Sequence, residues 1–152
     1  FRCVIFVTDS KYTKKILFIS FYIVILQGNQ WKEEMKKILV AEDTESNYLL
    51  LSIILRKEYE VYRAHDAQEA IEKFEGCRPD MILMDIKMPV MDGLEATRRI
   101  RLKGGTLPII ALTANAYDSD RDKAFEAGCD DYMAKPIMAP ALREMIEKYF
   151  GE

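Results

Sequence analysis

The chain has 152 residues, the length of one domain with a short appendage. Of these residues 49% are hydrophobic and 31% are charged, which is typical of a globular protein. Its formal net charge of −3, without a basic stripe, argues against a direct nucleic-acid partner. Three cysteines without CxxC spacing indicate free thiols rather than a disulfide frame or a zinc site, and the single histidine argues against a histidine-rich metal site.

Residues 1–34 differ from the rest and are interpreted as an N-terminal extension of unknown role. They carry five Lys/Arg against three Asp/Glu (net +2), whereas residues 35–152 carry 17 against 22 (net −5). The apolar run Ile16–Leu26 is too short for a membrane-spanning helix, which needs about 20 residues. Two lysines before this run resemble the start of a signal peptide, but a poor cleavage site follows. Met35 resembles the natural first residue of a protein chain. Free thiols are typical of a reducing compartment, so we expect a cytoplasmic protein.

From Lys37 onward, short apolar runs alternate with amphipathic segments. The apolar runs predict strands over Lys37–Ala41, Tyr59–Ala64, Asp80–Met84, Pro108–Leu112 and Asp131–Ala134. The first predicted helix is capped by Thr44 or Ser46 and runs through about Lys57. Further helices are predicted over Ala67–Glu75, Leu94–Leu102, Tyr117–Ala127 and Ala139–Phe150. Gly76 and Gly128 are expected to end the second and the fourth helix.

Five strands that alternate with five helices through short loops predict an α/β fold. Connections of this kind are right-handed, so the strands form a parallel sheet with helices on both faces. In such a sheet the carboxyl ends of all strands lie at one edge, where chemistry gathers. The residues that follow each strand are therefore the candidates for a functional site.

Candidate site residues follow four of the five predicted strands. Glu42 and Asp43 follow the first strand, Asp85 the third, Thr113 the fourth and Lys135 the fifth. Each alone is compatible with a helix cap, a turn residue or a solvated charge. Their joint occurrence at the ends of parallel strands predicts one cluster of three carboxylates, a hydroxyl and an ammonium group.

Three clustered carboxylates repel one another and require a cation. Oxygen ligands without His or Cys favour Mg²⁺, which takes one or two carboxylates together with waters and phosphate oxygens. A carboxylate beside Mg²⁺ can attack phosphorus and form an acyl phosphate. We therefore predict that Asp85 is the nucleophile, that Glu42 and Asp43 hold the metal, and that Lys135 and Thr113 contact the phosphoryl group.

Residues 35–150 resemble a response-regulator receiver domain, the phosphoacceptor part of two-component signalling. The segments that carry the resemblance are Val40-Ala41-Glu42-Asp43, Met84-Asp85-Ile86-Lys87-Met88-Pro89-Val90-Met91-Asp92-Gly93, Ala111-Leu112-Thr113-Ala114 and Tyr132-Met133-Ala134-Lys135-Pro136. The resemblance implies a doubly wound, flavodoxin-like sheet of order 2-1-3-4-5 and a cis Lys135–Pro136 bond. It also implies Mg²⁺ as cofactor, with Mn²⁺ able to replace it, and a metal site completed by the backbone carbonyl of Lys87.

The resemblance further implies a role in signalling rather than an enzyme that acts on other molecules. A histidine kinase or a histidine phosphotransfer protein would supply the phosphoryl group to Asp85. Thr113 and Tyr132 would be the switch residues, and the fourth helix, fifth strand and fifth helix would contact a downstream protein or form a dimer. Whether the chain acts alone or as the receiver of a hybrid kinase stays open.

Three alternative functions fit the sequence less well. An aspartyl phosphatase of the haloacid-dehalogenase type needs a second Asp two residues after the nucleophile, where this chain has Lys87. A flavodoxin-like cofactor site needs a phosphate loop after the first strand, but Glu42-Asp43-Thr44-Glu45 is acidic. A receiver that no longer accepts phosphate is disfavoured because every position of the predicted site is filled.

Overall fold

Five parallel strands form the centre of the computed structural model, which describes residues 35–114 and 118–151. The strands are β1 (Lys37–Ala41), β2 (Glu60–Ala64), β3 (Met81–Asp85), β4 (Ile109–Thr113) and β5 (Asp131–Ala134). The helices between and after them are α2 (Glu45–Leu55), α3 (Ala67–Cys77), α4 (Gly93–Leu102), α5 (Asp118–Ala127) and α6 (Ala139–Phe150). The predictions for residues 1–34 lie outside the described residues.

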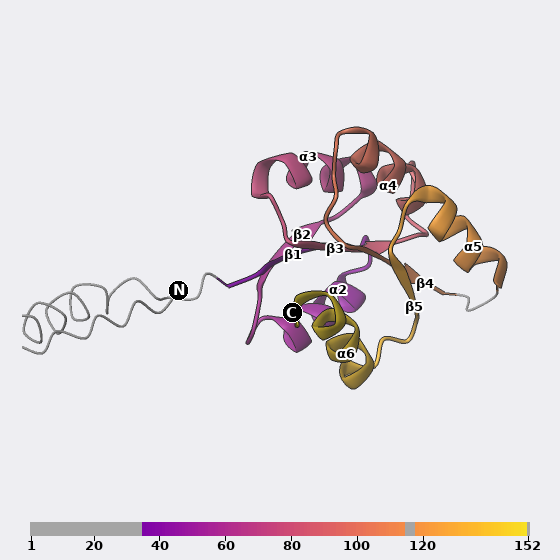
Figure 1. Cartoon of the computed structure of the whole chain (residues 1–152). Coiled ribbons are helices and arrows are strands. Elements are labelled where there is room, and N and C mark those ends of the chain that lie inside the picture. The colour runs from indigo at the N-terminus through magenta and orange to yellow at the C-terminus, as the bar shows by residue number, and fades with distance from the viewer. Residues whose placement is uncertain (1–34, 115–117, 152) are drawn as a thin grey trace, which may run out of the picture. The chain divides into compact units, whose positions relative to one another are not determined.

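The strands are ordered β2-β1-β3-β4-β5, and every neighbouring pair is parallel. Helices α3, α4 and α5 cover one face of the sheet, while α2 and α6 cover the other (Figure 1). This arrangement confirms the predicted doubly wound α/β fold and its strand order. The predicted cis bond between Lys135 and Pro136 is also present.

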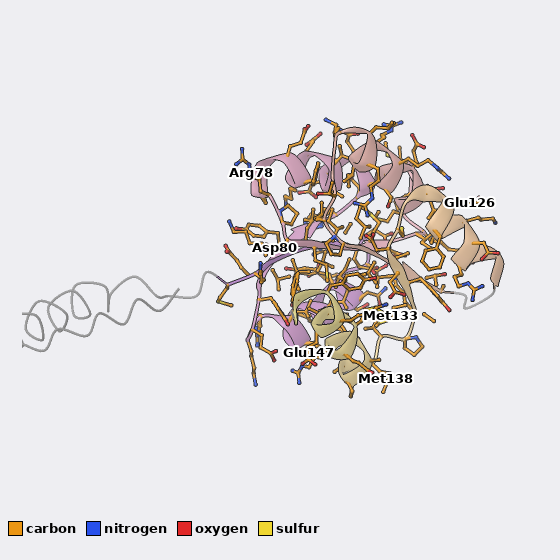
Figure 2. The ribbon with its side chains drawn as sticks, viewed as in Figure 1. Arg78, Asp80, Glu126, Met133, Met138 and Glu147 are labelled. Carbon is orange, nitrogen blue, oxygen red and sulfur yellow. The ribbon has the colours of Figure 1, made fainter. Side chains whose placement is uncertain are left out.

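The core consists of two apolar layers, one on each face of the sheet. Alternate residues of a strand point to opposite faces, so Leu39 joins the layer under α3 and α4, whereas its neighbour Ile38 faces α2 and α6. Figure 2 shows Met133 of β5, which belongs to the layer on the α6 side. Burial of each large aliphatic side chain contributes about 1.5–3 kcal/mol, which explains why the central strands are almost wholly apolar.

Two central strands begin and end one residue later than the sequence predicted. Asp85 and Thr113 are the last residues of β3 and β4 rather than the first residues of the following loops. Asp85 is opposite Leu112, whose carbonyl also accepts a hydrogen bond from the N–H of Ile86 at 3.0 Å. Both site residues therefore belong to the sheet, which holds their backbones in place.

The prediction that Gly76 ends the second helix was wrong. Helix α3 continues through Cys77, and Arg78 leaves it with a left-handed backbone (φ 48°). Pro79 follows, and a residue before proline is disfavoured in the helical conformation. Gly128 does follow α5, with a φ of 99° that favours glycine.

Among the described residues, no helix combines the length and the apolar character needed to cross a membrane.

The N-terminus of α3 is held by a reciprocal pair of hydrogen bonds. The Glu69 N–H donates to Asp66 Oδ1 at 2.7 Å, and Glu69 Oε2 accepts from the His65 N–H at 2.6 Å. The bond from the His65 N–H lowers the pKa of Glu69 most, followed by the bond from Lys73. The ionised carboxylate is therefore stabilised in the folded state.

Glu69→Gln is expected to lower the free energy of unfolding by about 0.5 kcal/mol at neutral pH, the size typical of a partly exposed ionic contact. Because the folded pKa is depressed, this contribution is present above the ordinary pKa of 4.5 and is lost as pH falls through the folded value. Urea unfolding across that range measures the difference. Glu72→Gln, on the same helix, is the control, and a pH-independent difference for Glu69→Gln would contradict the explanation.

Candidate functional site

The ends of four strands bring the predicted site residues to the same edge of the sheet. Glu42 directly follows β1, Asp85 ends β3, Thr113 ends β4, and Lys135 directly follows β5. The strand ends are in register, with Ala41 opposite Met84, Asp85 opposite Leu112, and Thr113 opposite Ala134. Residues separated by up to 93 positions in the chain thus meet in space.

The Lys135 ammonium group bridges two buried carboxylates. Its Nζ lies 2.7 Å from Glu42 Oε2 and 2.8 Å from Asp85 Oδ2. The Glu42 side chain is 0% exposed and that of Asp85 is 6% exposed, so neither carboxylate has bulk water as its main partner. Charged groups this deeply enclosed need a partner of opposite charge, and Lys135 supplies it to both.

Three carboxylates form a group that could hold a metal ion. One oxygen from each of Glu42, Asp43 and Asp85 lies within 4.8 Å of the others. Asp43 is exposed, in contrast to the two buried members. Three carboxylates and the Lys135 ammonium together leave a charge of −2, which a divalent cation would neutralise. An all-oxygen donor set of this kind fits Mg²⁺.

The buried position perturbs both members of the Asp85–Lys135 pair. Burial raises the pKa of Asp85 above its ordinary value, although the hydrogen bond and the charge of Lys135 oppose this rise. For Lys135, burial lowers the pKa, but the combined hydrogen bonds and charges of Asp85 and Glu42 outweigh it and raise the pKa above the usual range. The raised pKa keeps Lys135 protonated at neutral pH, as a cation between the two carboxylates.

The loop between β3 and α4 wraps around Asp85. The backbone N–H of Lys87 donates to Asp85 Oδ1 at 3.1 Å, whereas the Lys87 side chain is exposed. Gly93 closes this loop, with its N–H bonded to the Ile86 carbonyl at 2.9 Å. A Cβ at Gly93 would lie 2.0 Å from the Asp85 carbonyl oxygen, so the close approach requires glycine. The metal-binding role of the Lys87 carbonyl stays a prediction.

Thr113 and Tyr132 lie on adjacent strands. Thr113 is buried, and its carbonyl accepts a hydrogen bond from the Lys135 N–H at 2.7 Å. Tyr132 is opposite Ala111, two residues before Thr113, and therefore lies on the same face of the sheet as Thr113. Its ring meets that of Phe125 edge to face, with centroids 6.2 Å apart. The switch roles of Thr113 and Tyr132 stay predictions.

Asn47 is a site residue that the sequence did not reveal. It lies in the first turn of α2, and its Nδ2 donates to Glu42 Oε1 at 2.9 Å. The available signal was a polar residue in the first turn of a helix that begins just after Glu42. That signal is weak, because polar residues are common at the start of any helix.

Comparison with known proteins places the chain among signalling domains. The family model for the response regulator receiver domain matches residues 38–147. The hybrid signal transduction histidine kinase G of Dictyostelium discoideum is 42% identical over 119 residues. That match covers 74% of this chain but only 4% of the kinase, so this chain spans a small part of that relative.

Two solved structures resemble the fold closely. The receiver domain of the sensor histidine kinase PA1611 from Pseudomonas aeruginosa, with magnesium in its active-site cleft, is 40% identical with a TM-score of 0.71. The match covers 77% of this chain and 98% of that one. The co-crystal structure of the Saccharomyces cerevisiae phosphotransfer protein Ypd1 with the receiver domain of Ssk1 gives 31% identity and a TM-score of 0.71. It covers 75% of this chain and 88% of the matched chain.

Proposed function

The chain belongs to the response regulator receiver domain family over residues 38–147, and from this premise we propose that Asp85 is its phosphoacceptor. The observation that carries the proposal is the Lys135 ammonium held between Asp85 and Glu42. It places a fixed cation 2.8 Å from an Asp85 oxygen, where phosphoryl charge would develop. The receiver domain is taken to span residues 35–152, with residues 1–34 as an extension of unassigned role.

Mg²⁺ would be held by the carboxylates of Glu42, Asp43 and Asp85 together with the Lys87 carbonyl. Mn²⁺ could occupy the same site in place of Mg²⁺. Their proximity and their uncompensated negative charge support this assignment, as does the magnesium in the similar PA1611 receiver domain. When bound, the metal neutralises charge on phosphoryl oxygens. Lys135 and Thr113 would contact those oxygens from the other strands.

The reaction would transfer a phosphoryl group from a phosphohistidine to Asp85. An Asp85 carboxylate oxygen attacks phosphorus, an O–P bond forms, and the P–N bond breaks. The imidazole leaves with the electron pair of that bond and takes up a proton. Water would later attack phosphorus, the Asp85 O–P bond would break, and Asp85 would return to its carboxylate form as inorganic phosphate leaves. The chain would thus catalyse its own phosphorylation and dephosphorylation and act on no other substrate.

The phosphoryl donor would be a sensor histidine kinase or a histidine phosphotransfer protein. The similarity to a hybrid histidine kinase, and to a receiver domain that was crystallised together with the phosphotransfer protein Ypd1, supports both sources. The chain would act as a stand-alone regulator or as the receiver part of a hybrid kinase.

The net charge of −5 on residues 35–152 (17 Lys/Arg against 22 Asp/Glu) favours a protein target over nucleic acid. The free thiols of Cys77 and Cys129 support a cytoplasmic location.

Phosphorylation would change the surface formed by α5, β5 and α6. It adds roughly −1.5 to −2 charges at Asp85, together with new acceptor oxygens. Movement of Thr113 toward the phosphoryl group would open space beside β4 into which Tyr132 can turn. This surface would then bind a downstream protein or a second copy of the chain. A minor active conformer that lies a few kcal/mol higher is sufficient for such a switch.

Acetyl phosphate tests the proposal directly. Intact mass should show one phosphoryl adduct when the chain is incubated with acetyl phosphate and Mg²⁺ or Mn²⁺, and no adduct with EDTA. Asp43→Asn should raise the Mg²⁺ concentration for half-maximal phosphorylation by at least about 10-fold, because one metal carboxylate is lost. Asp122→Asn, an exposed position on α5, is the matched control. Equal phosphorylation with Mg²⁺ and with EDTA would refute the metal-dependent reaction.

A further inference from the structure

We propose that Asn47 is a positioning residue for the metal site and acts through Glu42. The inference rests on the proposed function, because it concerns how strongly the same site holds Mg²⁺. Asn47 donates its side-chain amide to Glu42 Oε1 at 2.9 Å, while Lys135 donates to Glu42 Oε2 at 2.7 Å. Each oxygen of the Glu42 carboxylate therefore has its own side-chain donor.

Asn47 is the main hydrogen-bond donor to Glu42 Oε1, because the surroundings of this buried carboxylate offer few others. The Glu42 side chain is 0% exposed, so bulk water is not at hand to replace a lost donor. The other donor to Oε1 is the Thr44 N–H at 3.4 Å, which is long for a hydrogen bond. Glu42 and Asn47 both line a cavity of about 70 Å³. Lys135 also lines this cavity, and its remaining lining residues are apolar: Leu50, Leu51, Pro136 and Ile137.

The amide thus fixes the rotation of the Glu42 carboxylate. With Oε1 held by Asn47, Oε2 stays on Lys135, and Lys135 in turn stays 2.8 Å from Asp85 Oδ2. Without the amide, Glu42 can turn, and both the spacing of the three carboxylates and the place of Lys135 become less defined. Partners that orient metal ligands in this way typically account for 10- to 100-fold in metal affinity.

Calorimetric titration of the metal-free chain with Mg²⁺ tests the inference. Asn47→Leu keeps nearly the same side-chain size but removes the donor, and it should weaken Mg²⁺ binding about 10-fold or more. Asn47→Gln keeps an amide and should recover most of the affinity. Ser46→Ala, at the exposed neighbouring position of α2, should bind as the wild type does.

The outcomes separate this inference from the proposed function. Wild-type protein that binds no Mg²⁺ would overturn the proposed metal site itself. Wild-type binding with unchanged affinity in Asn47→Leu would overturn only the role of Asn47. Equal losses in Asn47→Leu and Asn47→Gln, accompanied by equal falls in the melting temperature of the metal-free protein, would show a packing role and would also overturn it.

Discussion

Asp85→Asn is expected to abolish the phosphoryl adduct that acetyl phosphate and Mg²⁺ produce on the wild-type chain. The amide keeps the shape of the side chain but is not a nucleophile, so the Asn side chain cannot attack phosphorus. The amide also removes one of the three clustered carboxylates. Intact mass after incubation measures the adduct, and Mg²⁺ titration measures the accompanying loss of metal affinity.

Asp122→Asn serves as the control for Asp85→Asn because it neutralises an exposed aspartate on α5. It should become phosphorylated to the same extent as the wild type. An adduct of the same mass on the Asp85→Asn protein would show that phosphate is attached elsewhere and would remove the basis of the assignment.

Lys135→Ala is expected to destabilise the metal-free protein by about 3 kcal/mol, because two buried carboxylates lose their shared cation. Glu42 and Asp85 would then repel each other in a poorly hydrated site. Mg²⁺ should restore part of this loss, since a dication can neutralise the same oxygens. Phosphorylation should be slower by roughly 10²-fold even with Mg²⁺, because a preorganised charge near the phosphoryl group is missing. Urea unfolding with and without Mg²⁺ measures the first effect, and the rate of adduct formation measures the second.

Lys148→Ala is the matched control for Lys135→Ala. Lys148 also pairs with an aspartate, Asp131, at 2.7 Å, but its side chain is 62% exposed. Exposed pairs of this kind contribute little because water and salt screen them. Equal stability losses in Lys135→Ala and Lys148→Ala would mean that the Lys135 bridge has no special energetic role.

The strands, the helices and the parallel α/β class followed from local patterns in the sequence, whereas the strand order 2-1-3-4-5 was implied by the resemblance to receiver domains. The apolar runs, the amphipathic segments and the punctuation by Gly and Pro identified every described strand and helix to within a few residues at its ends, because burial period and turn chemistry are properties of short segments. The convergence of Glu42, Asp85 and Lys135 was predictable for a similar reason: a parallel sheet brings all carboxyl strand ends to one edge.

The contacts within the site were decided by the tertiary structure. The sequence did not show that Glu42 is wholly buried while the adjacent Asp43 is exposed, that Asn47 donates to Glu42, or that Gly93 leaves no room for a Cβ beside the Asp85 carbonyl. These features depend on how α2 and α4 pack against the sheet, at distances of a few ångströms. The sequence of a short segment indicates which of its faces is apolar, but not which atoms of a distant segment it will contact. Such contacts are determined only when the elements pack together.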